Sequence, residues 1–247
     1  MSIESPEQFV LLREVGRICH LALREMARNV RPGISTKELA DAGAKVMREN
    51  GARSAPVMVY GFPGEICISV NEEAVHGIPG KRKLDPGDLV KLDVTFEKNE
   101  YMGDAAITVP VEPVSDEARR LVRCAERAFH QAMRVARAHH RVSEIGRAVE
   151  HEVRRSGFVV VRELGGHGIG RTIHEPPSVP NYEDWKAGQR LTAGLVITVE
   201  PIIAMGAGKT KTAEDGWTER TIDSSLSAHF EHTIVITEKA PILLTAA

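Results

Sequence analysis

Two aspartates, Asp93 and Asp104, stand eleven residues apart in a segment that is typical of a β-hairpin. Residues 92–96 and 101–109 have strand-like composition, and polar residues typical of a turn separate them. With the turn centred on residues 98–99, we expect Asp93 directly opposite Asp104, because cross-strand partners have Cβ atoms roughly 4.5–5.5 Å apart. Two carboxylates this close need a shared proton or a cation between them. The pair therefore indicates half of a metal site; the alternative is two solvated aspartates on an exposed hairpin.

The composition excludes several classes of function. The chain has 247 residues, of which 42% are hydrophobic, which is enough for one large domain or two small ones. The net charge of −2 provides no field that attracts nucleic acid, and no apolar run approaches the roughly 20 residues of a membrane span. The 3 cysteines have no CxxC spacing, and the polar start has no signal-peptide core. We expect a cytoplasmic protein that neither inserts into membranes nor reads nucleic acid.

The order of predicted elements repeats along the chain. The first set comprises helices over 6–30 and 35–51, the second opened by a Ser-x-x-Glu capping box, and strands over 65–70, 89–96 and 101–109. The second set comprises helices over 115–138 and 143–156 and strands over 158–161, 195–203 and 230–237. This repeat predicts one α/β (α+β) domain, 1–247, with half-repeats at about 5–110 and 115–237. Two halves about a pseudo-twofold axis would bring four carboxylates together at the centre: Asp93, Asp104, Glu200 and Glu231.

Four histidines are candidates for the same site. Glycines flank His167 on both sides, which lets a ligand approach the backbone closely and favours a coordinating imidazole over a packed core histidine. His76 and His174 lie beside glycine or proline turns, where site residues tend to be held, although a lone histidine of this kind is more often structural. His229 lies two residues before Glu231, on the same strand face, and could support that ligand by a hydrogen bond.

The chemistry of this donor set indicates hydrolysis. One imidazole and four carboxylates form an oxygen-rich site that suits divalent Mn, Fe, Co or Zn. Four carboxylates are too many for one catalytic zinc, so we expect two metal ions. A water held between two such ions has a pKa near neutrality, which makes it a nucleophile.

In this order, the residues resemble the bacterial type I methionine aminopeptidases, within the pita-bread metallopeptidases. The likeness runs from about Pro6 to Thr237, and its motifs are 67–72, 76–79, 93–94, 103–104, 166–170, 199–201, 215–217 and 227–233. The resemblance implies a duplicated α/β unit in which helices cover the outer side of a curved, mainly antiparallel sheet.

The resemblance also implies a role for each candidate residue. The implied metal ligands are Asp93, Asp104, His167, Glu200 and Glu231, with Asp104 and Glu231 bridging two ions. Glu200 would also shuttle a proton. His174 would hydrogen-bond the scissile carbonyl oxygen, and His76 would contact the amide nitrogen and help protonate the leaving amine. Phe62 and Trp217 match positions that line the side-chain pocket.

The chain departs from the family pattern at several positions near the implied site. Ile173 stands where an aromatic residue usually precedes the second site histidine, and Pro56 and Val59 stand where cysteine and tyrosine often line the pocket. His229 replaces a usual glutamine, and Lys91 replaces a usual neutral residue. None of these changes removes an implied ligand, but they leave the shape of the pocket open.

We therefore expect a monomeric dimetal aminopeptidase that removes the initiator methionine from nascent polypeptides, whose N-termini it would meet at the ribosome. One alternative is an Xaa-Pro aminopeptidase or prolidase; those relatives usually carry a large additional N-terminal domain, whereas this chain starts its first repeat almost at Met1. The other alternative is a non-catalytic peptide-binding member of the fold, which typically lacks several ligands. Comparing hydrolysis of Met-Ala and Xaa-Pro substrates would distinguish the two enzymes. Measuring metal binding by the purified protein would distinguish the non-catalytic member from both.

Overall fold

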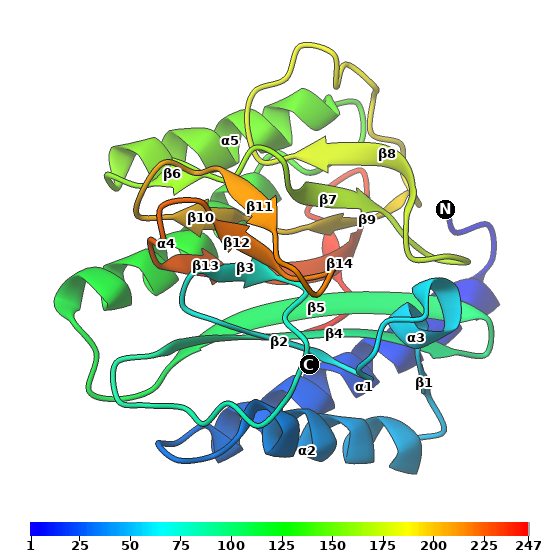
Figure 1. Cartoon of the computed structure of the whole chain (residues 1–247). Helices are drawn as coiled ribbons and strands as arrows, with labels where there is room; N and C mark the ends of the chain where they lie inside the picture. Colours follow the sequence, from blue (N-terminus) through cyan, green and yellow to red (C-terminus); the bar gives the residue numbers. More distant parts are fainter. Residues whose placement is uncertain (247) are drawn as a thin grey trace.

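Two pairs of helices enclose three β-sheets in the computed structural model, which describes residues 1–246 (Figure 1). The helices are α1 (Pro6–Asn29), α2 (Thr36–Glu49), α3 (Ala55–Tyr60), α4 (Asp116–Met133) and α5 (Val142–Arg155). The first seven strands are β1 (Arg53–Ser54), β2 (Cys67–Val70), β3 (Glu73–Val75), β4 (Leu89–Lys98), β5 (Tyr101–Pro110), β6 (Val159–Val160) and β7 (Gly165–Gly168). The others are β8 (Glu175–Pro180), β9 (Val196–Val199), β10 (Ile202–Ala204), β11 (Thr210–Thr212), β12 (Glu219–Thr221), β13 (Ser227–His229), β14 (Glu231–Val235) and β15 (Ile242–Leu243).

The helices begin where the sequence places good caps. Ser5 caps α1, with Pro6 in the first turn. The predicted capping box of α2 is present, because Ser35 Oγ accepts from the Glu38 N–H at 3.2 Å and the Glu38 carboxylate accepts from the Ser35 N–H at 2.8 Å. The third long helix was predicted to reach residue 138, but α4 ends at Met133 and the next residues form turns that connect to α5.

The large sheet has nine strands, and all of its pairings are antiparallel. Its main order is β1-β4-β5-β14-β9-β7-β8, with β2 also on β4 and β15 also on β14. Two three-stranded sheets, β13-β10-β6 and β11-β12-β3, lie beside it. The mainly antiparallel character predicted from the family resemblance is therefore confirmed.

The β4–β5 hairpin differs from its predicted register. Asn99 and Glu100 have positive φ values of 52° and 67°, typical of a two-residue turn whose twist matches the flanking strands. Lys98 therefore pairs with Tyr101, and every later pair shifts with it. The expectation that Asp93 faces Asp104 directly is wrong: Asp93 pairs with Ala106 and Asp104 with Thr95. The two aspartates are diagonal neighbours on one face, still within reach of a common ion.

The predicted strand over 195–203 is in fact two strands in different sheets. Glu200 falls between β9 and β10, and Pro201 follows it. Proline has no N–H to donate to a β-ladder, so the strand breaks there. The break turns Glu200 out of the ladder and sends the chain from the large sheet into the β13-β10-β6 sheet.

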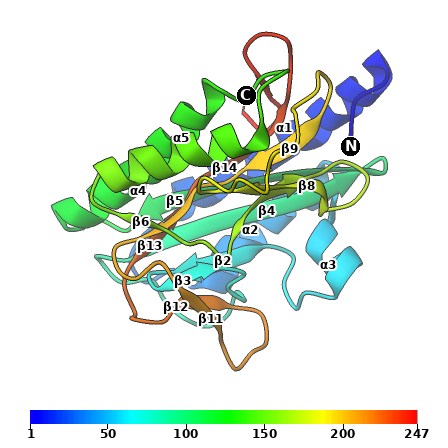
Figure 2. The same cartoon turned by 90° about the horizontal axis from the view of Figure 1, so that it is seen from above.

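The helix pairs occur at corresponding positions along the chain, as the repeat predicts. The pair α1 and α2 covers one core, and α4 and α5 cover another; Figure 2 shows α4 and α5 side by side across the strands. Strands β5 and β14 join the two sets through pairs Ala106–Glu231 and Ala105–His232. The half-repeat boundaries stay a prediction. Within residues 1–246, the structure contains no helix that is both long and apolar enough to cross a membrane.

Gly146 lies on α5 where this helix packs against the end of β8. A Cβ at this position would lie 2.1 Å from the Tyr182 carbonyl oxygen and 2.6 Å from that of Pro180. Helix propensity favours Ala by about 1 kcal/mol, whereas such overpacking costs about 1–3 kcal/mol or more. We expect Gly146→Ala to lower the free energy of unfolding in urea, while Gly80→Ala, which meets nothing within 4 Å, leaves it nearly unchanged. A stabilised Gly146→Ala variant would contradict this packing.

Candidate active site

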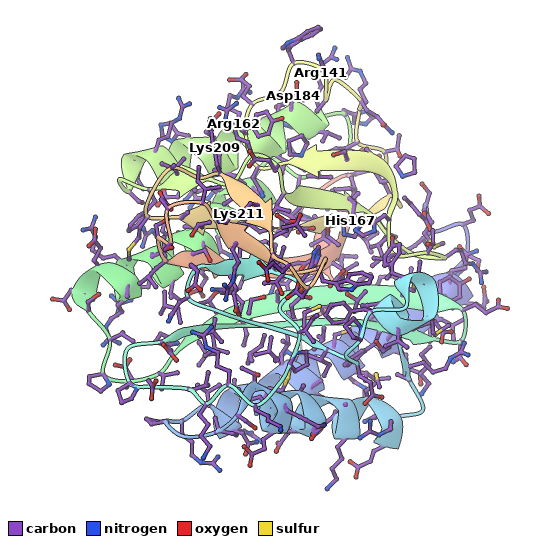
Figure 3. All side chains as sticks on the ribbon, viewed as in Figure 1. Arg141, Arg162, His167, Asp184, Lys209 and Lys211 are labelled. Atoms are coloured by element: carbon purple, nitrogen blue, oxygen red, sulfur yellow. The ribbon has the colours of Figure 1, made fainter. Side chains whose placement is uncertain are left out.

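The five predicted ligand residues come from five adjacent strands of the large sheet. Its order β4-β5-β14-β9-β7 carries them in the sequence Asp93, Asp104, Glu231, Glu200 and His167, with Glu200 directly after β9. Figure 3 places His167 in the region between the two helical layers. Residues that are far apart in the chain therefore meet at the middle of the sheet, as the repeat predicts.

The carboxyl groups of this cluster are buried close to one another. Asp104 is 6% exposed, Glu200 8% and Glu231 2%. Burial raises the pKa of Asp104 and Glu231 well above the ordinary carboxyl range, and the neighbouring carboxylates raise both further. Burial also raises the pKa of Glu200, and it raises that of Asp93 to about 6. The protein alone supplies too little positive charge to keep all four ionised.

The donor atoms fit a divalent cation. Among the described residues, Asp104 Oδ1 and Glu231 Oε1 are buried without a hydrogen-bond partner. Two sets of ligand atoms lie within 4.8 Å of one another: Asp104, His167 and Glu231, and Glu200, His229 and Glu231. Glu231 belongs to both sets and Asp104 to one, whereas Asp93 lines the same cavity outside these two sets.

Hydrogen bonds orient the imidazole of His167. Its Nδ1 lies 2.9 Å from the Gly168 carbonyl oxygen, which can only accept, so Nδ1 carries the proton and Nε2 is free as a ligand. Nε2 lies 3.5 Å from Glu200 Oε1. Thr198 Oγ1 accepts from the His167 N–H at 3.0 Å and donates to Glu200 Oε1 at 2.8 Å. Desolvation lowers the pKa of both His167 and His229, which favours the neutral, coordinating form.

Two further threonines fix site residues by their backbones. Thr233 Oγ1 accepts from the Asp104 N–H at 2.9 Å and donates to the Asp104 carbonyl at 2.8 Å. Thr108 Oγ1 makes the same pair of bonds to His229, both at 2.8 Å. Each hydroxyl replaces two ladder bonds where strand pairing is interrupted.

A cavity of about 230 Å³ opens above this cluster. Its lining includes all of the predicted site residues: Phe62, His76, Asp93, Asp104, His167, Ile173, His174, Glu200, Trp217, His229 and Glu231. Phe62 and Trp217 meet edge to face with ring centroids 5.3 Å apart, and Asp215 Oδ1 accepts from the backbone N–H of Trp217 at 2.8 Å. The cavity therefore combines an acidic floor with an aromatic and aliphatic wall, although the residue roles stay predictions.

His76 and His174 are exposed at the rim of the cavity. His76 has a positive φ of 58°, and Gly77 beside it packs against the Ile68 carbonyl, where a Cβ would come within 2.3 Å. Desolvation by the surrounding walls lowers the pKa of His76, and desolvation together with His167 lowers that of His174 to about 4. Both imidazoles are neutral at pH 7 and can each donate one N–H.

Tyr60 is a site residue that the sequence reasoning missed. Its hydroxyl lies 2.5 Å from His174 Nδ1, and it lines the cavity from the end of α3. Pro56, at the start of the same helix, also lines the cavity, whereas Val59 is 40% exposed and lies outside the described lining. The cap Ser54 and the left-handed Gly61 are helix signals, but a helix of 6 residues is too short for periodicity to reveal.

Known proteins resemble this chain along its whole length. The model of metallopeptidase family M24 matches residues 10–238. Methionine aminopeptidase 2 of Bacillus subtilis is 44% identical over 247 residues, covering 99% of both chains, and methionine aminopeptidase 1 of the same organism is 40% identical over 242 residues, covering 98% of both.

Solved structures agree with this assignment. The methionine aminopeptidase of Rickettsia prowazekii superposes with a TM-score of 0.95 at 34% identity, covering all of both chains. The prolidase of Pyrococcus furiosus has a TM-score of 0.80 at 22% identity, and only 65% of it is covered, so that likeness concerns the fold alone. With its five donor residues on adjacent strands of a pita-bread fold, the chain belongs to metallopeptidase family M24.

Proposed function

We propose that this protein is a divalent-metal-dependent aminopeptidase that removes N-terminal methionine from peptides and newly made proteins. The observation that carries the proposal is the convergence of four carboxylates and an imidazole beneath a pocket with aromatic walls. Identities of 40% and 44% to curated methionine aminopeptidases over almost the whole chain support the substrate. We further propose that it acts in the cytoplasm, as a monomer, on N-termini emerging from the ribosome.

Two divalent ions, of Mn, Fe, Co or Zn, would be held by Asp93, Asp104, His167, Glu200 and Glu231. When bound, such ions polarise a carbonyl group and lower the pKa of water. Unpartnered oxygens on Asp104 and Glu231 favour two ions sharing these residues. The free α-amine of the substrate would meet this acidic floor, which limits cleavage to the first residue.

The protein's own groups then handle the protons and orient the peptide. Glu200 would accept a proton from the attacking water and pass it on. His174 would donate its Nε2–H to the scissile carbonyl oxygen, where negative charge develops. This role requires the Tyr60 hydroxyl to donate to His174 Nδ1, which leaves the proton of the neutral imidazole on Nε2. His76, which also lines the cavity, would face the amide nitrogen.

The wall of the cavity suits an unbranched thioether. Phe62, Trp217 and Ile173 supply apolar and polarisable contacts, and methionine sulfur packs well against aromatic edges. A proline-specific protein shares this fold at lower sequence identity. The Pyrococcus furiosus prolidase is 22% identical, against 40% and 44% for the two methionine aminopeptidases of Bacillus subtilis. A non-catalytic role is disfavoured because every implied ligand is present.

Hydrolysis of three tripeptides tests the proposal. We expect metal-stripped protein, supplemented in turn with Mn, Co, Fe and Zn, to release methionine from Met-Ala-Ser and to leave Leu-Ala-Ser and Ala-Pro-Ser nearly intact. Branching at Cγ makes leucine wider than the methionine side chain near the wall formed by Phe62 and Trp217. Faster release from Ala-Pro-Ser would assign the chain to the proline-specific branch. Cleavage of none of the three with any metal would contradict an enzymatic function.

Replacing Tyr60 by phenylalanine tests the orientation of His174. The variant keeps the ring but loses the hydroxyl at Nδ1, so we expect kcat to fall about 10–100-fold, the usual cost of removing a group that orients a site residue. KM and metal content should change little. Val59→Ala, at the exposed neighbouring position, is the control and should keep full activity. If Tyr60→Phe instead raised KM with kcat unchanged, the hydroxyl would contact substrate rather than His174.

Calorimetric titration with Co²⁺ tests whether the carboxyl groups on the floor of the cavity are protonated before metal binds. Burial raises the pKa values of Asp104 and Glu231 well above the ordinary range, so metal binding should displace the protons that these groups hold. The heat should therefore depend on the ionisation enthalpy of the buffer, and affinity should rise with pH. His174, with a pKa of about 4, is already neutral and contributes nothing. A heat independent of buffer would mean that the carboxylates are ionised before metal binds.

A further inference from the structure

His229 has an environment that a hydrogen-bonding role does not explain. Its side chain is 2% exposed, and within residues 1–246 both ring nitrogens are buried without a hydrogen-bond partner. An imidazole nitrogen deprived of water and of partners carries the full desolvation penalty of that group. Two carboxylate oxygens lie close to its Nε2, Glu231 Oε2 at 3.3 Å and Glu200 Oε2 at 3.9 Å, but neither contact has the geometry of a hydrogen bond.

We propose that His229 is a sixth metal ligand, whose Nε2 coordinates the ion held by Glu200 and Glu231. The proposal rests on the metal dependence proposed above and extends its ligand set. Two atoms that each lie about 2.1 Å from one ion are roughly 3–3.5 Å apart at octahedral or tetrahedral angles. The His229–Glu231 separation falls in that range, as does the 3.5 Å between His167 Nε2 and Glu200 Oε1.

The backbone holds His229 in this place. His229 is the last residue of β13, where it pairs with Ile202 of β10, and Thr108 on β5 bonds both its N–H and its carbonyl. Its side chain is therefore fixed on rigid strands in the same way as those of the predicted ligands. Glu231, two residues further on, presents its carboxylate to the same cavity.

Coordination by His229 would give each of the two ions one nitrogen donor. One set of ligand atoms contains His167 and the other contains His229, and Glu231 is common to both. Each ion would then have one imidazole, where the five-ligand set gives only one imidazole to two ions. Nitrogen donors favour Co²⁺ and Zn²⁺ over Mn²⁺, so the second imidazole would shift the metal preference in that direction.

Proton NMR of the Co²⁺-loaded protein tests the assignment without using activity. An imidazole bound to paramagnetic Co²⁺ through Nε2 has a strongly shifted, solvent-exchangeable Nδ1–H. We expect two such signals in the ¹⁵N-histidine-labelled wild-type protein, from His167 and His229, and one in His229→Gln. The second equivalent of Co²⁺ should bind about 10–100-fold more weakly to His229→Gln by calorimetry, while the first is little affected. The rim variant His76→Gln should keep both signals.

Glutamine keeps an N–H donor of similar reach, so the variant separates coordination from hydrogen bonding. Unchanged Co²⁺ affinities and an unchanged signal count in His229→Gln would overturn the proposal. The wild-type spectrum is a second test that does not depend on the folding of a variant: stoichiometric Co²⁺ binding with one shifted signal would overturn the ligand assignment alone. Failure of the wild-type protein to bind Co²⁺ would overturn the proposed metal dependence together with it.

Discussion

Mutual repulsion among buried carboxylates constrains the centre of this molecule. Asp93, Asp104, Glu200 and Glu231 line one cavity, and burial raises the pKa of each. The buried amine of Lys91 is committed elsewhere: it donates to the Asn71 carbonyl at 2.7 Å and reaches that of Ser227 at 3.4 Å. Protons or external cations must therefore balance the charge, and the free energy of metal binding becomes part of the stability of the loaded fold.

The sheet tolerates this repulsion because apolar cores and buried hydroxyl groups hold the strands that carry the acidic residues. Large apolar cores under the two helix pairs hold the strands, and buried threonines complete the backbone bonding where pairing is interrupted. Thr233 holds Asp104, Thr108 holds His229 and Thr198 links His167 to Glu200. Since each hydroxyl both donates and accepts, no polar backbone group at these positions is left dependent on the metal. The proposed ligands thus stand on strands whose backbone bonding is complete within the protein.

Sequence reasoning succeeded where a pattern recurs and failed where geometry depends on one turn or one missing N–H. The repeat placed four acids together because both halves carry them at matching positions. It could not predict the pairing of Asp93, because the tight Asn99–Glu100 turn shifts the register by two residues. Nor did it predict the break after β9, although Pro201 was visible. The sequence could not predict Tyr60 as a site residue, because the contact between Tyr60 and His174 joins residues 114 positions apart.

The acidic floor of the cavity and its apolar wall are built from different elements. A sequence change in the wall therefore has a different effect from a change in the floor. The floor stands on paired strands, whereas the wall comes from the short helix α3 and from loops such as the one between β11 and β12 that carries Trp217. Pro56 and Ile173, which depart from the family pattern, belong to the wall, where they can reshape the side-chain pocket without disturbing a ligand. His229 is a departure on the floor, within reach of two carboxylates. A change there would act on the proposed metal centre, so its effect should be sought in metal binding before specificity.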